Sequence, residues 1–137
     1  MMKVYQTKVK KLPGTEFKEL HPKALAIFKG IKGKSRRRPY LRSAYFKKDK
    51  IFLDYFWQHL WQKNWRDRTR RLKYYPCALD LIKNSSVEPI SKENPNNRSE
   101  ILHRFAGTTS DKELFFVQII EDKKTNQKRF ISVFPVE

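Results

Sequence analysis

The stretch "ILHRFAGTTSDKELFFVQIIEDKKTNQKRFISVFP", residues 101–135, decides the fold of this chain. Its runs "LFFVQII" and "RFISVFP" are rich in β-branched and aromatic residues, and polar segments typical of turns separate the runs. An earlier run, "EILHRFAG", ends at Gly107. The pattern predicts an antiparallel meander sheet of three to four strands. Its middle strand is apolar on both faces, which indicates a sheet packed on a helix and partly covered on its other side.

Two polar residues, Gln118 and Ser132, interrupt these apolar runs. A polar residue in an apolar strand either faces water or needs a hydrogen-bond partner. If both residues share one face, they line a shallow groove together with either His103 or Arg104, because neighbours in a strand point to opposite faces. The alternative is a solvated, open sheet face. Simple alternation puts Gln118 with Leu114, Phe116 and Ile120, and Ser132 with Phe130 and Phe134.

Residues 50–73 precede this sheet and predict the main helix. Two adjacent helical stripes support it: Phe52, Phe56 and Leu60, and Leu53, Trp57, Trp61 and Trp65. We interpret the aromatic side chains as core, and a base-stacking surface is the alternative. Pro76 suits the first position of a second, short helix, "PCALDLIKN", in which Cys77 is a small core residue. The polar residues 84–99 predict a connecting loop.

Positive charge is concentrated in the first part of the chain. The net charge is +17, and residues 1–50 hold 16 Lys or Arg against 3 acidic residues. This imbalance predicts a basic nucleic-acid-binding arm over 1–50, with one short helix, "HPKALAIFKGI", and an α+β domain over 51–137. The alternative for the arm is a solvated tail. We expect removal of the arm to weaken nucleic-acid binding far more than it destabilises the fold.

Arginines crowd the end of the predicted main helix in a larger number than the helix dipole favours. Phosphate contact explains the excess. The candidate nucleic-acid-binding residues are Lys34, Arg36, Arg37, Arg38, Arg42, Arg66, Arg68, Arg70, Arg71, Lys124 and Arg129.

Other classes of protein are disfavoured. The single cysteine excludes an internal disulfide, and the three histidines lie too far apart for zinc spacing, so we expect no metal and no cofactor. The basic stretches lack an amphipathic helical pattern, which disfavours a membrane surface. The N-terminus has no apolar segment of a secretory signal. We expect a cytoplasmic protein whose partner is nucleic acid, RNA more than DNA.

The motif "HRF-x-G", followed by "F-x-V-Q-I" and "S-V-F-P", resembles the nuclease domains grouped as barnase–EndoU–colicin–RelE-like, above all their phage and mobile-element members. The resemblance covers residues 51–137 loosely and 101–135 more specifically. It implies helices before an antiparallel sheet and cleavage of RNA without a metal. It also implies roles for His103 as acid or base, for Arg104 as phosphate clamp and for Ser132 as a hydrogen-bonding group, with Lys124 or Arg129 adding charge.

The chain departs from that group in its acidic residues and histidines. No carboxylate lies inside the predicted strands, although some members of the group use one in catalysis. Other members use two histidines, and His59 on the predicted helix would have to be the second one here.

The first functional expectation is a toxin-type endoribonuclease, with an acidic antitoxin or the ribosome as partner. The alternative is a non-catalytic RNA- or DNA-binding protein, either ribosome-associated or an accessory of a mobile element.

Overall fold

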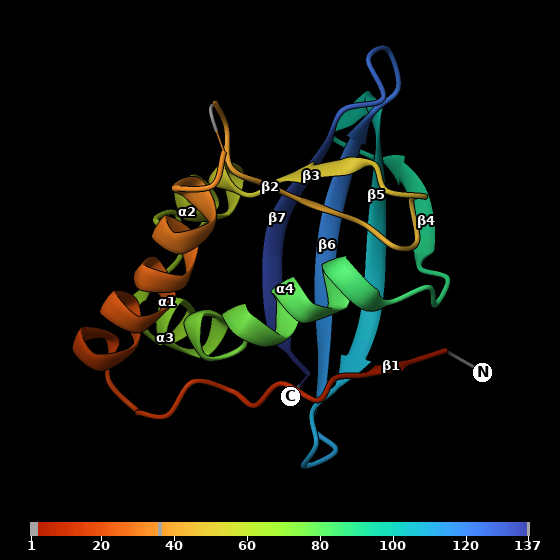
Figure 1. Cartoon of the computed structure of the whole chain (residues 1–137). Coiled ribbons are helices and arrows are strands. Elements are labelled where there is room, and N and C mark those ends of the chain that lie inside the picture. The colour runs from red at the N-terminus through yellow and green to blue at the C-terminus, as the bar shows by residue number, and fades with distance from the viewer. Residues whose placement is uncertain (1–2, 36, 137) are drawn as a thin grey trace.

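The computed structural model describes residues 3–35 and 37–136 of the chain. Within them the chain forms an α+β fold with four helices and one mixed sheet of seven strands, which curls into a half-barrel (Figure 1). The elements are β1 (Tyr5–Gln6), α1 (Phe17–Lys32), β2 (Tyr40–Arg42), β3 (Lys50–Phe52), α2 (Asp54–Leu60), α3 (Trp65–Lys73), α4 (Tyr75–Asn84), β4 (Ile90–Asn94), β5 (Asn97–Thr108), β6 (Leu114–Asp122) and β7 (Lys128–Pro135).

The sheet is larger than the predicted meander. Strands β5, β6 and β7 pair antiparallel as predicted, but the strand order is β1-β5-β6-β7-β3-β2, with β4 on β5. Strand β1 runs parallel to β5, and β3 runs parallel to β7. The expectation of a plain antiparallel meander is therefore wrong. The predicted loop 84–99 also contains a strand, β4.

The predicted helix over 50–73 is three separate elements. Its first residues form β3, and the helical part breaks between α2 and α3. The side chain of Asn64 caps α3 by accepting a hydrogen bond from the backbone N–H of Asp67. The predicted short helix "HPKALAIFKGI" lies within α1, and the predicted short helix that starts at Pro76 lies within α4. The break at Asn64 adds one helix to the two expected after residue 50, so the described residues contain four helices.

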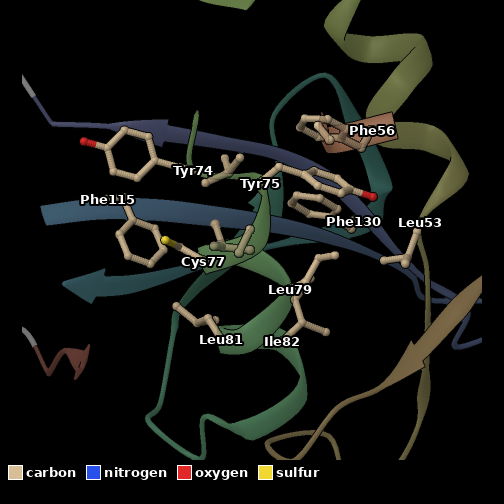
Figure 2. Close-up of a cluster of buried hydrophobic side chains, with 14 of the residues drawn as sticks. Leu53, Phe56, Tyr74, Tyr75, Cys77, Leu79, Leu81, Ile82, Phe115 and Phe130 are labelled. Atoms are coloured by element: carbon tan, nitrogen blue, oxygen red, sulfur yellow. The ribbon is translucent and has the colours of Figure 1, made fainter. Parts of the chain in front are cut away.

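The core lies between the sheet and α4, which crosses one face of it (Figure 1). Figure 2 shows Phe56, Tyr75 and Phe130 grouped in this core, and the rings of Phe56 and Phe130 stack with centroids 4.9 Å apart. Cys77 is fully buried, as predicted, and burial raises the pKa of its thiol to about 11. An inert thiol in an apolar environment fits a packing role.

The segment 1–50 contributes to the same core. Leu20 and Ala24 of α1 are fully buried. The hydroxyl groups of Tyr5 and Thr7 both donate hydrogen bonds to the carboxylate of Asp80 on α4. The segment is therefore folded with the sheet, and its predicted role in nucleic-acid binding stays a prediction.

Candidate nucleic-acid site on the outer face of the sheet

The face of β5, β6 and β7 that points away from α4, called the outer face below, carries the polar residues noted in the sequence. Arg104 pairs with Gln118, and Gln118 pairs with Ser132, so the three side chains form a row across the three strands. The predicted alternation of β6 is confirmed, because the opposite set is buried: Phe115, Val117 and Ile119. The sheet therefore brings Arg104 and Ser132 to one face, as the shallow groove requires.

A β-bulge sets the position of Ser132. Gln118 pairs with Ser132, but Ile119 pairs with Phe130, which leaves Ile131 as an extra residue in β7. The predicted grouping of Phe130 with Ser132 and Phe134 is wrong for this reason. Phe130 is turned into the core, where it is fully buried.

Two arginines meet over one aromatic ring on this face. The guanidinium group of Arg71, from α3, lies 5.3 Å from the ring centroid of Phe134 and donates a hydrogen bond to the hydroxyl of Ser132. The guanidinium group of Arg104 lies 5.6 Å from the same centroid and 5.6 Å from that of Phe116. We call Arg71, Arg104, Gln118, Ser132 and Phe134 the outer-face site. Helix α3 contacts β7, which is how Arg71 reaches the sheet.

The electrostatics of this site favour an anion. Burial lowers the pKa of the Arg71 guanidinium, nearby Asp67 opposes the shift and Arg70 adds to it. Arg104 is exposed, and among the described residues its side chain makes cation–π contacts but no ion pair. Both guanidinium groups lie near the ring of Phe134, and each is able to donate charge-assisted hydrogen bonds to a phosphate.

His59 of α2 is a histidine whose pKa is influenced by the charge of Arg71 in this site. It is half-buried, and burial lowers the pKa of its imidazole, with further lowering by the positive charges of Lys63 and Arg71. A lowered pKa keeps the imidazole neutral at pH 7, as a proton acceptor needs to be. The sequence predicts His59 on the main helix but not the influence of Arg71 on it, because that influence depends on how α2 and α3 are placed in the fold.

His103, the predicted acid or base, lies on the opposite face of the sheet. Its side chain is buried, with Nδ1 2.6 Å from the Ser91 hydroxyl and Nε2 2.9 Å from a carboxylate oxygen of Glu121. Because a carboxylate accepts, Nε2 donates to Glu121, and in the neutral ring Nδ1 then accepts from the Ser91 hydroxyl. The ring of Phe46 packs edge-on at 5.0 Å. The structure therefore brings Arg104 and Ser132 together and leaves His103 apart from them.

A second basic surface lies beside β2 and β3 and is called the basic groove. Two adjoining hollows of about 610 and 520 Å³ form it, sharing Lys50, Phe52 and Gln127. The predicted nucleic-acid-binding residues Lys34, Arg37, Arg38 and Arg42 line these hollows, together with Tyr40 and Lys48. Arg36 lies outside the described residues. Arg38 is already paired with Asp54, at 3.1 Å.

The other predicted cations have different environments. Arg129 pairs with Glu100 at 2.5 Å and lies over the ring of Tyr55, so its charge is compensated within the fold. Lys124 is exposed in the hairpin between β6 and β7. Arg66 and Arg70 line a hollow beside Trp65 and Phe17, and Arg68 packs on Trp61 and Trp65. Arg71 is thus the predicted helix arginine that joins the outer-face site.

No helix in the described part of the chain has the length and apolar character needed to span a membrane. Comparison of the sequence and the structure with protein families, curated proteins and solved structures finds no significant match.

Proposed function

We propose that the chain is an endoribonuclease that cleaves RNA at the outer-face site, by attack of a 2′-hydroxyl and without a metal ion. The observation that carries this proposal is the pair of guanidinium groups, of Arg71 and Arg104, around Phe134 and beside the Ser132 hydroxyl. Positioned cations of this kind stabilise the charge that develops on a phosphorane. The resemblance of residues 101–135 to metal-independent nucleases supports the same chemistry.

The reaction needs a proton acceptor, a charge clamp and a leaving group. The 2′-oxygen forms a bond to phosphorus while the bond from phosphorus to the 5′-oxygen breaks. His59 accepts the proton of the 2′-hydroxyl, and the leaving 5′-oxygen takes a proton from water. Arg71 and Arg104 hold the non-bridging oxygens, with Ser132 as a further donor. The products are a 2′,3′-cyclic phosphate and a 5′-hydroxyl.

The test is incubation of the purified chain with end-labelled RNA in EDTA, followed by analysis of the product ends. We expect cyclic phosphate ends, and no cleavage of the same sequence made with 2′-deoxy sugars. Arg71→Ala and Arg104→Ala should each lower the single-turnover rate, by about 10²–10³-fold for a lost charge-stabilising group. A matched control is Arg98→Ala, since the Arg98 side chain is 89% exposed.

The second candidate is a non-catalytic nucleic-acid-binding protein. The basic groove favours it, because lysines, arginines and the rings of Tyr40 and Phe52 line one concave surface. If the wild-type chain binds RNA and cleaves none in any buffer, with or without added Mg²⁺, the nuclease proposal fails and this candidate replaces it. An acidic inhibitor protein or a ribosomal surface would meet the same cations, and either partner stays a prediction.

A further inference from the structure

Two tryptophans that the sequence assigns to the core are exposed. Trp61 is 48% exposed and Trp65 is 64% exposed. The guanidinium group of Arg68 lies 4.7 Å from the ring of Trp61 and 5.6 Å from the ring of Trp65, and it donates a hydrogen bond to the backbone oxygen of Trp61. The ring of Phe17 packs edge-on against both tryptophans. We call Phe17, Trp61, Trp65 and Arg68 the tryptophan patch.

The two exposed tryptophans of the patch are not core residues, although Phe17 packs against the core. Trp57 takes the core position of the stripe, in contact with Phe28, Phe56 and Tyr75. Helix α2 ends at Leu60 and α3 begins at Trp65, so one continuous helix does not carry Trp57, Trp61 and Trp65 on a single face. Edge contacts from Phe17 and the guanidinium of Arg68 hold the rings in place while leaving much of their area to solvent.

The tryptophan patch adjoins the outer-face site along one helix. Arg68 and Arg71 are both in α3, three residues apart, so they are neighbours on the helix surface, about 5–6 Å apart at Cβ. Helix α3 contains five basic residues and one acidic residue. It lies against α1 and β7, so it links the patch beside Phe17 to the sheet (Figure 1).

We propose that the tryptophan patch is a stacking subsite for an unpaired base of the RNA strand whose phosphate occupies the outer-face site. This inference rests on the proposed function and adds to it that the substrate is single-stranded at the cleavage site. An exposed indole stacks on the face of any base that is free of a duplex, and arginine beside it adds a cation–π contact. Phosphates of the same strand would also meet the positive charge of α3, which has five basic residues and one acidic residue, and a neutral apolar peptide offers no such complementarity.

The first test uses the wild-type chain and needs no variant. The probe is a fluorescently labelled RNA of about 8 nucleotides, a length within the range of known single-strand site sizes. Its 2′-O-methyl sugars have no free 2′-hydroxyl to attack the phosphate, so the experiment measures binding without cleavage. A set of such oligonucleotides carries one abasic position each. We expect one or two abasic positions to weaken binding by about 5–100-fold, the effect of losing one stacked base. Uniform affinity along the set overturns the proposal.

The second test assigns the lost stacking to the patch. Trp61→Ala and Trp65→Ala should bind the intact oligonucleotide about 5–100-fold more weakly and show no further loss at the sensitive abasic position. Trp65→Phe should restore most of the affinity, and a blunt duplex of the same sequence should bind wild type and variants alike. Melting temperatures identify a variant that fails to fold, and Trp65→Ala, at the more exposed of the two positions, then carries the comparison.

The outcomes separate this inference from the proposed function. If Arg71→Ala abolishes cleavage while the folded tryptophan variants bind and cleave like wild type, the nuclease proposal holds and the stacking subsite is rejected. If tryptophan substitutions weaken duplex and single strand equally, stacking on an unpaired base is also rejected. If wild type cleaves no RNA but the tryptophans determine single-strand affinity, the stacking surface is supported and the nuclease proposal alone fails.

Discussion

The guanidinium group of Arg71 donates a hydrogen bond to the hydroxyl of Ser132, 61 positions away in the sequence. The bond joins α3 to the outer face of β7 and covers Ser132, which is only 2% exposed although its strand face is open. The same guanidinium lies beside the ring of Phe134, so one arginine contacts two of the residues that the sheet contributes to the site.

Replacing Arg71 by Lys should therefore cost activity although the charge is kept. A lysine ammonium is a point donor and lacks the planar fork that contacts Ser132, Phe134 and a phosphate at once. We expect the single-turnover cleavage rate to fall by about 10²–10³-fold. If Arg71→Lys and wild type cleave at equal rates and have the same melting temperature, the planar guanidinium group is not needed for cleavage.

His59→Gln tests the proton acceptor through its pH dependence. The pKa of the imidazole is lowered in the folded chain by burial and by Lys63 and Arg71. If neutral His59 accepts the proton, the rate should fall as pH drops through a pKa below the ordinary value of 6.5. His59→Gln should lose that acid limb and about 10²–10⁴-fold of the rate. An acid limb that persists in the variant contradicts the assignment.

The same lowered pKa predicts a stability effect with a definite sign. Below pH 6.5 the unfolded chain binds a proton at His59 more readily than the folded chain, so the folded state loses stability as pH falls. His59→Gln lacks this loss. Urea midpoints of both proteins at about pH 7.5 and about pH 5 should show the variant losing less stability on acidification.

His103→Ala distinguishes a structural from a catalytic histidine. Its ring nitrogens are used by Ser91 and Glu121 inside the fold. Removing the ring leaves polar groups unpaired, so we expect a loss of about 1–3 kcal/mol of stability. Cleavage per folded molecule should be unchanged at a temperature where the variant is folded. A drop of about 10²–10⁴-fold in that rate, without loss of stability, would instead support the catalytic role that the family resemblance implies.

The sheet strands β5, β6 and β7 were predictable because each is long enough to show a pattern. Strands β1, β2 and β3 have two or three residues, too few for any periodicity to show. The break after α2 is hidden because tryptophans at 57, 61 and 65 continue a helical spacing through it. Only the three-dimensional turn reveals that Trp65 faces solvent.

Part of the candidate site was predictable from the alternation of side chains along the strands. Strand alternation limits the partners of Gln118 to one of two adjacent residues, and Arg104 is the one that shares its face. The bulge at Ile131 and the lowering of the His59 pKa by the charge of Arg71 depend on how separate elements pack. No local pattern in the sequence encodes those relationships.

Gly107→Ala tests the close packing of β5 on α4. A Cβ at Gly107 would lie 2.6 Å from the Phe115 ring and 2.9 Å from Leu81, nearer than real contacts allow. Overpacking of this kind costs about 1–3 kcal/mol. Gly30→Ala is the matched control, because a Cβ there meets nothing within 4 Å inside α1, and it should raise stability by about 0.5–1 kcal/mol. Urea denaturation of both variants measures the difference, and equal midpoints would contradict the packing argument.

The role of the segment 1–50 in binding has to be tested by substitution, because deletion removes core residues. Without Leu20 and Ala24 the core loses two buried side chains, so we expect the chain 51–137 to be unfolded or aggregated.

The better variant replaces Lys34, Arg37, Arg42 and Lys50 of the basic groove by Gln in the full chain. If these groups contact phosphates of a single strand, each contributes about 0.7 to the slope of log affinity against log salt. The slope for a single-stranded RNA should therefore fall in magnitude by about 2–3, while the melting temperature stays near that of wild type. A control with the same loss of charge replaces Lys8, Lys83, Arg98 and Lys112, all exposed and outside the groove. If both sets of substitutions reduce the slope equally, binding follows net charge alone and the basic groove has no specific role.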